Sequence, residues 1–228
     1  MKSILLNLVF FSGIIIAQNN FTAENVKGEV KILNGNSEKW IELENNQTVN
    51  NDAILSTGKN SSVKLVGNDL SLTMKEESAV SVSDIKKMNM DELLLALAVE
   101  EILDAPQKNN KGNSENTAVY GSDEKERNNA VINSDDFGFK RLSGAVQLSE
   151  NGMPESAVVV AKEVYRKYPG TKNDVNYRIY FADILYSKGL YEEAMTEYKS
   201  LQEMNLSEKQ NADVQEKLAS IKKKLLSE

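Results

Sequence analysis

The chain has 228 residues, a formal net charge of −7, and neither cysteine nor histidine. The lack of cysteine excludes disulfides, and the lack of histidine removes the commonest general base and metal ligand. The acidic balance argues against nucleic acid and anionic lipid as partners. This length predicts one or two small globular domains.

The N-terminus has the pattern of a signal peptide. Lys2 precedes an apolar run at residues 4–16, which ends in Ala17-Gln18. We predict a signal peptide at residues 1–17 that is cleaved near Ala17, because the run is shorter than the roughly 20 residues of a membrane span. The alternative is an uncleaved anchor. The expected location is therefore periplasmic, secreted or cell-surface, with no integral membrane span after cleavage.

Residues 18–88 are predicted to form a β domain. Between residues 26 and 84, apolar and polar residues alternate in six short runs that turn residues separate. The clearest pair is a hairpin around the turn Gly67-Asn68-Asp69. Thr57-Gly58 is predicted to be a tight turn that needs a permissive backbone. Short strands with close turns predict a compact sandwich or roll.

The segments VKGEVKI, WIEL and TVNNDAILSTGKNSSVKLV follow one another over about sixty residues. In order and spacing this region resembles the FecR domain, the periplasmic domain of bacterial iron-citrate signalling regulators and of many envelope proteins. Those regulators carry a cytoplasmic segment and a membrane span before the domain, whereas a signal peptide is predicted here. The resemblance therefore implies the domain type and not a sigma-factor role. Trp40, the only tryptophan, is predicted to be a core anchor rather than a ligand platform.

Residues 89–103 are predicted to form an amphipathic helix. Asn89 is a suitable N-cap, and the stretch DELLLALAVEEIL that follows is too apolar to be left in water. The favoured interpretation is that this helix packs on the β domain and covers an open face or edge. The alternative is a helix that docks a partner.

Apolar residues then become scarce. Residues 104–138 are rich in Asn, Ser, Lys and Glu and are predicted to be a polar, largely disordered linker. Residues 117–121, TAVYG, interrupt this composition and could add a strand to the β domain.

Residues 139–228 contain an internal repeat. LSENGMPESA at residues 148–157 aligns with LYSKGLYEEA at residues 185–194, with a constant offset of 37 residues. Each copy predicts a helix, a glycine turn and a second helix. A last helix at residues 207–226 is predicted to cap the array. The fold class is therefore α+β, with an all-β region followed by helical hairpins.

The stretch YFADILYSKGLYEEAMTEY resembles tetratricopeptide repeats, and Pro169 lies where that family ends its second helix. Arg178, by contrast, occupies a position that is usually apolar. Such repeats bind extended peptides or partner helices in a groove that the first helix of each pair lines. The resemblance implies a protein-binding groove lined by Asn176, Tyr180, Asp183 and Ser187. The alternative is that the two hairpins are merely a small helical domain, with Tyr180 and Tyr186 as packing residues.

We expect no catalytic, cofactor-binding or metal site and no cofactor. Nucleophile systems built on histidine or cysteine are excluded, and no phosphate-binding or calcium loop is found. The adjacent carboxylates Glu76-Glu77, Glu100-Glu101 and Asp135-Asp136 are interpreted as solvated surface.

The leading hypothesis is a non-enzymatic bacterial envelope protein that acts as an adaptor or scaffold. Its expected partners are envelope proteins or a peptide segment, and a cell-wall component is a further candidate. One alternative is a ligand-sensing or cell-wall-sensing module of FecR-type signalling. A second is a glycan hydrolase that works through carboxylates alone.

Overall fold

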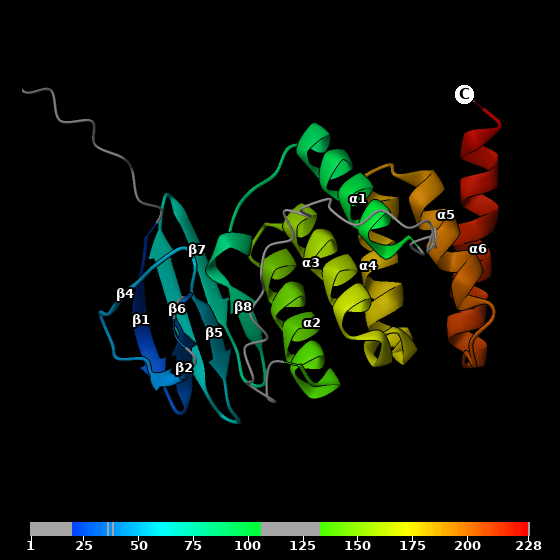
Figure 1. Ribbon diagram of the computed structural model, residues 1–228. Helices are drawn as coiled ribbons and strands as arrows, with labels where there is room; N and C mark the ends of the chain where they lie inside the picture. Colours follow the sequence, from blue (N-terminus) through cyan, green and yellow to red (C-terminus); the bar gives the residue numbers. More distant parts are fainter. Residues whose placement is uncertain (1–19, 36, 38, 106–132, 228) are drawn as a thin grey trace, which may run out of the picture.

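The computed structural model describes residues 20–105, apart from residues 36 and 38, and residues 133–227. The predicted signal peptide, the predicted strand at residues 117–121 and most of the predicted linker lie outside the described residues. An N-terminal antiparallel β region precedes a helical region, so the predicted α+β fold class is confirmed (Figure 1).

The described β region has eight strands, two more than the sequence predicts. They are β1 (Phe21–Lys27), β2 (Val30–Leu33), β3 (Ile41–Glu42), β4 (Thr48–Val49), β5 (Ile54–Thr57), β6 (Ser62–Gly67), β7 (Leu70–Met74) and β8 (Ala79–Ser81). Two antiparallel sheets, β4-β1-β6-β7 and β3-β2-β5-β8, bury alternate apolar residues against each other, as in a sandwich.

The first alternating run divides into two strands at Gly28. β1 and β2 belong to different sheets, and Gly28 between them has a φ of 71°. A Cβ at this position would lie 2.4 Å from Ser61 Oγ, which accepts a 2.8 Å hydrogen bond from the backbone N–H of Glu29. Glycine alone combines this φ with so close an approach, so the chain changes sheet here. The two-residue strand β4 is the second that the sequence pattern does not predict.

The predicted hairpin is confirmed. β6 and β7 pair with Gly67 opposite Leu70, and Asn68 and Asp69 between them have φ values of 52° and 58°. Two successive positive φ angles define the type I′ turn, which matches the twist of the flanking strands.

The prediction that Thr57-Gly58 needs a glycine for its backbone conformation is wrong. Gly58 does not lie in the left-handed region, and its N–H donates a 2.9 Å hydrogen bond to the carbonyl oxygen of Glu29. The left-handed residue of this turn is Asn60, with a φ of 54°. Thr57 is buried instead, and its hydroxyl donates a 2.6 Å hydrogen bond to the carbonyl oxygen of Lys75.

Six α-helices and two 3₁₀ turns follow in the described residues. They are η1 (Val82–Asp84), α1 (Met90–Asp104), α2 (Asp135–Glu150), α3 (Pro154–Lys167), η2 (Pro169–Asn173), α4 (Val175–Ser187), α5 (Tyr191–Leu201) and α6 (Glu208–Leu225). Pro169 ends the second helix of the first pair, as the sequence predicts. The last helix begins with a capping box between Ser207 and Gln210 and buries Leu218 and Ile221.

α1 begins where the sequence predicts, but it packs elsewhere. Asn89 and Glu92 exchange side-chain-to-backbone hydrogen bonds of 2.8 and 2.9 Å, which make a capping box. The predicted packing on the β domain is wrong, because α1 lies on α3, away from the sheets (Figure 1). Arg166 of α3 holds it through a 2.9 Å ion pair with Glu100.

α2 occupies the place beside the sheets that the sequence assigns to residues 89–103. It begins at Asp135, inside the predicted linker at residues 104–138, and Ser134 caps it by accepting a 3.2 Å hydrogen bond from the N–H of Phe137. β7 is the outer strand of one sheet and β8 of the other, and α2 packs along both. This helix therefore covers one edge of each sheet.

Polar side chains of α2 and of its C-cap Asn151 accept hydrogen bonds from the β7 edge. The N–H of Lys75, just beyond β7, donates to Gln147 Oε1 at 2.9 Å, and the N–H of Thr73 donates to Asn151 Oδ1 at 3.2 Å. A Cβ on Gly144 would lie 2.1 Å from a backbone carbonyl oxygen of β8, so glycine is needed for this approach. The buried apolar residues of both regions form one cluster. The two predicted modules are therefore packed as a unit.

The two predicted glycine turns have the same geometry. Gly152, between α2 and α3, has a φ of 83°, and Gly189, between α4 and α5, has a φ of 79°. In each turn the residue after the glycine donates a 3.0 Å hydrogen bond to the carbonyl oxygen five residues earlier, as in a Schellman motif. The predicted pair of helical hairpins is therefore confirmed at both turns.

Trp40 lies at the junction between the two regions rather than in the core of the sandwich. Its side chain is half-buried, and its ring meets that of Phe137 of α2 edge to face, with centroids 6.2 Å apart. The only tryptophan of the chain therefore reports on the contact between sheets and helices.

Candidate functional site

The four residues predicted to line a groove, Asn176, Tyr180, Asp183 and Ser187, all lie on α4, and α6 contacts part of the same face. Asn176 Oδ1 accepts a 3.0 Å hydrogen bond from Gln210 Nε2 of α6. Asp183 Oδ1 lies 3.6 Å from Lys217 Nζ of α6 and accepts a 2.5 Å hydrogen bond from the hydroxyl of Tyr198. Two of the four are thus engaged in contacts with α6.

The other two residues of this set are not gathered around a hollow. Tyr180 is half-buried and packs edge-on against Phe181, with ring centroids 5.2 Å apart, while Ser187 is exposed at the end of α4. The predicted groove role of all four stays a prediction. A hollow of the described chain lies elsewhere, between α1, α3 and α5.

The outer face of α1 carries a continuous set of exposed apolar side chains. Leu95 and Ile102 are 69% and 73% exposed. The other large apolar residues of this face are Met90, Leu94, Val99 and Leu103. We call these six residues the α1 face. Contiguous exposed apolar surface marks an interaction site in soluble proteins.

α1 is apolar on both sides, so the prediction of an amphipathic helix is wrong. Leu93 is fully buried against the helical array and Leu97 is half-buried, yet the six residues of the α1 face point away. A helix that is apolar all round is normally covered on every side. On α1 one side is covered by α3 and the other by none of the described residues.

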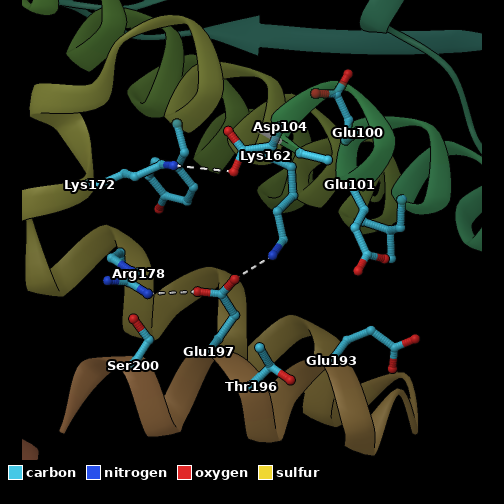
Figure 2. Close-up of a pocket in the computed structure, with 13 residues that line it drawn as sticks. Glu100, Glu101, Asp104, Lys162, Lys172, Arg178, Glu193, Thr196, Glu197 and Ser200 are labelled. Atoms are coloured by element: carbon cyan, nitrogen blue, oxygen red, sulfur yellow. Dashed lines mark hydrogen bonds and ion pairs between the residues drawn. The ribbon is translucent and has the colours of Figure 1, made fainter. Parts of the chain in front are cut away.

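A cavity of about 570 Å³ lies between α1, α3 and α5 (Figure 2). Leu97 and Glu101 line it from α1, Lys162 and Tyr165 from α3, and Glu193 from α5. The remaining lining residues are Glu100, Asp104, Ala105, Lys172, Arg178, Thr196, Glu197 and Ser200. Figure 2 shows Lys172 and Arg178 at one end of this space and Glu101 and Glu193 at the other.

Glu197 is the carboxylate of the cavity lining that pairs with two cations. It forms ion pairs with Lys162 of α3 and, at 3.0 Å, with Arg178 of α4 (Figure 2). Burial alone would raise the pKa of the Glu197 carboxyl, but the attraction and hydrogen bonds of the two cations outweigh burial and lower that pKa below its ordinary value. Lys172 is likewise paired, 3.4 Å from Asp104. Each of the three cations of the lining is therefore paired with a carboxylate of the same lining, and Lys162 and Arg178 share one.

Three polar groups of the lining have no such partner. The hydroxyl of Tyr165 is buried without a hydrogen bond among the described residues, and burial raises the pKa of this phenol. The carboxylates of Glu101 and Glu193 form no ion pair or hydrogen bond with any described residue. Buried polar groups normally have partners, so the phenol in particular requires one.

Within the described part of the chain, no three acidic, histidine or cysteine side chains are grouped so that they could hold a metal ion. The adjacent carboxylates are engaged separately: Glu77 lies 3.6 Å from Lys140, and Glu76 accepts a 2.7 Å hydrogen bond from the N–H of Asn60. The cavity offers hydrogen-bond acceptors and fixed charges. Its chemistry suits the binding of a ligand or side chain.

One residue of the sequence pattern points to the cavity. Arg178 occupies a position that is usually apolar in the repeat pattern, and in the structure this cation pairs with Glu197 inside the lining. Tyr165 and Glu193 read as ordinary helix residues, because their neighbours in the cavity come from other helices.

Comparisons with protein-family models, with curated proteins and with solved structures give no match. The resemblances to the FecR domain and to tetratricopeptide repeats therefore stay predictions. In the described ranges, 20–105 and 133–227, none of the helices has the length and apolar character that crossing a membrane requires.

Proposed function

We propose that this protein is an exported, non-enzymatic adaptor of the cell envelope, and that the α1 face is where a partner protein binds. The observation that carries the proposal is the exposure of six large apolar side chains on one helix that ion pairs hold in place. Full burial of such a side chain contributes about 1.5–3 kcal/mol. Covering even half of the α1 face would therefore stabilise a complex substantially.

The anchorage of α1 supports an interface rather than a loosely attached helix. Glu100 accepts hydrogen bonds from both Nε and Nη2 of Arg166, at 2.9 and 3.4 Å, so the guanidinium holds α1 in a fixed orientation. Lys172 adds a contact to Asp104 at the far end. A rigidly held face loses little conformational entropy when a partner binds.

The experiment is cross-linking of the tagged protein in cells, followed by identification of the partner and measurement of its affinity for the purified full chain. The test variant is Leu95→Asn with Ile102→Asn, because both side chains are largely exposed and their replacement leaves the core intact. The control is Ile41→Asn with Leu226→Asn, which removes two exposed apolar residues elsewhere. Loss of the partner in the test variant alone supports the proposal, and equal capture by both variants overturns it.

Export is the second part of the proposal, and it rests on the sequence pattern of residues 1–17, outside the described residues. Mass spectrometry of the protein from the cell envelope tests it. A mature chain that begins near Gln18 supports export with cleavage. A full-length chain found in the cytoplasm contradicts it.

A further inference from the structure

We propose that the partner segment seated on the α1 face is a helix with an apolar side and at least one Lys or Arg, and that this basic side chain enters the cavity between α1 and α5. The inference rests on the proposed function, since it names the kind of partner that the same surface takes. The apolar face, the charge of α1 and the unpartnered groups of the cavity each support it.

The charge of α1 favours a basic partner. The helix contains no basic residue and five acidic ones, namely Asp91, Glu92, Glu100, Glu101 and Asp104. Among the described residues, only Glu100 and Asp104 of these five are paired with cations. The acids that remain flank the apolar face and repel other acidic surfaces.

The same charge argues against two other occupants. A second copy of the chain would bring its own α1, with five more carboxylates and no cation, against the first. An anionic membrane surface would be repelled as well. A helix that combines apolar residues with Lys or Arg satisfies both the apolar surface and the acids.

The α1 face continues into the cavity. Leu97 lines the cavity, and Glu101, one turn later, lines it too. Leu94 precedes Leu97 by three residues, and Ala98 precedes Glu101 by three, so each pair is adjacent on the helix surface. Leu94 and Ala98 are both exposed. A helix that packs on Leu94 and its neighbours therefore lies beside Glu101, within reach of the cavity mouth for a long side chain.

The unpartnered groups of the cavity fit a cation. Glu101 and Glu193 offer carboxylates that no described residue pairs with, while Lys162 and Arg178 are both paired with Glu197. Tyr165 is 6% exposed, and its hydroxyl has no partner among the described residues. A guanidinium or ammonium group supplies a donor for the buried hydroxyl of Tyr165 and a positive charge opposite the two carboxylates, of which Glu101 is exposed and Glu193 half-buried. The volume of about 570 Å³ admits the end of such a side chain.

The test uses synthetic peptides and the full chain. Each probe is an 18-residue amphipathic helix of Leu, Ala and Gln that carries one Arg at the edge of its apolar side, and the set moves this Arg through the edge positions. The matched peptide has Gln in place of Arg. Isothermal titration measures affinity for the wild type, for Glu101→Gln with Glu193→Gln, and for the control Glu208→Gln with Glu216→Gln. Glu208 and Glu216 are exposed acids of α6, so the control changes net charge equally.

We expect the best Arg peptide to bind the wild type and the control about tenfold tighter than the Gln peptide, and this preference to vanish in the Glu101→Gln, Glu193→Gln variant. If both peptides bind equally well and Leu95→Asn with Ile102→Asn abolishes binding, the inference fails and the proposed function stands. If no peptide binds and the wild type sediments as a dimer that Leu95→Asn with Ile102→Asn dissociates, the occupant is a second copy and the inference is wrong. If no peptide binds a monomeric wild type, the inference fails, and the fate of the proposed function is decided separately by the cross-linking experiment.

Discussion

Arg141 of α2 and Asp84 of η1 form a 3.0 Å ion pair at the junction of the sheets and the helices. Arg141 is 5% exposed, and its guanidinium also lies 3.4 Å from Glu163 of α3 and donates a 3.0 Å hydrogen bond to Ser81 Oγ. Burial raises the pKa of the Asp84 carboxyl in spite of the attraction of Arg141. One cation thus joins the end of the β region to two helices.

The first prediction concerns this cation. Arg141→Met leaves the largely buried Asp84 without its cation, whereas Glu163 keeps Lys167 at 2.9 Å, and we expect the free energy of unfolding to fall by about 3 kcal/mol. Urea unfolding followed by the fluorescence of Trp40 measures the change, because that residue lies at the same junction. Lys75→Met is the control: its ion pair with Glu150 is exposed and contributes about 1 kcal/mol or less. Equal losses in the two variants would contradict the prediction.

The second prediction compares two glycines. A Cβ on Gly144 would lie 2.1 Å from the carbonyl oxygen of Ala79, so Gly144→Ala forces α2 away from β8 and is expected to cost about 1–3 kcal/mol. Gly152 has open space around it but a φ of 83°, so its replacement meets backbone strain alone. Asparagine tolerates that φ better than alanine does.

The order of the variants in urea unfolding separates the two causes. We expect Gly152→Asn to be more stable than Gly152→Ala, whereas Gly144→Asn is less stable than Gly144→Ala because the larger side chain worsens the clash. If the Asn variant were the more stable one at both Gly144 and Gly152, or the less stable one at both, the two glycines would not differ in the way we propose.

The sequence predicts features whose geometry is decided within a few residues. Asn68-Asp69 favours a two-residue turn with positive φ angles, and Gly152 and Gly189 favour helix ends. The division of the first β run at Gly28 is harder to predict, because the approach of Ser61, 33 residues further on, requires the glycine there.

The placement of the helices could not be predicted, because it depends on which helix completes the sheet edges. Gln147 and Asn151 read as ordinary polar residues of a helix, yet they accept hydrogen bonds from the β7 edge. With that edge covered by α2, α1 packs on α3, and no described residue covers its outer apolar face. The cavity combines side chains of several elements, so neither its lining nor Tyr165 follows from a local pattern.

The third prediction is a pH dependence. The pKa of Glu197 lies below its ordinary value of 4.5, because Lys162 and Arg178 outweigh the effect of burial. The folded state therefore binds this proton more weakly than the unfolded state. Glu197 contributes stability that is fully present above about pH 4.5 and is lost as the pH falls through the folded-state pKa.

Urea unfolding between pH 7 and pH 3 tests this sign with Glu197→Gln as the comparison. We expect the variant to be less stable than the wild type at pH 7 and the gap to shrink toward pH 3, as the wild-type carboxylate becomes protonated. Glu208→Gln, an exposed substitution on α6, should show no such convergence. A gap that stays constant with pH would mean that Glu197 contributes through packing alone.

The fourth prediction decides whether the predicted groove residue Asp183 has a packing role. Tyr198 is fully buried, and its hydroxyl donates a 2.5 Å hydrogen bond to Asp183 Oδ1. Asp183→Ala leaves that phenol buried without an acceptor and is expected to cost about 1–3 kcal/mol. Tyr198→Phe should cost less, because the Asp183 carboxylate is partly exposed and keeps water and Lys217 as partners.

A double-mutant cycle on these two residues, combined with partner capture, completes the test. We expect a coupling of about 1 kcal/mol between Asp183 and Tyr198 and unchanged partner capture by the folded Asp183→Ala variant, because in our proposal the partner binds α1. Ser187→Arg is the control on the same helix: it is exposed, so stability should change by about 0.5 kcal/mol or less. If instead Ser187→Arg and Asp183→Ala abolish partner capture, while the changes in unfolding free energy and the coupling energy stay near zero, the partner binds along α4. The binding surface would then be the one predicted from the repeat pattern, and the exposed face of α1 would need another explanation.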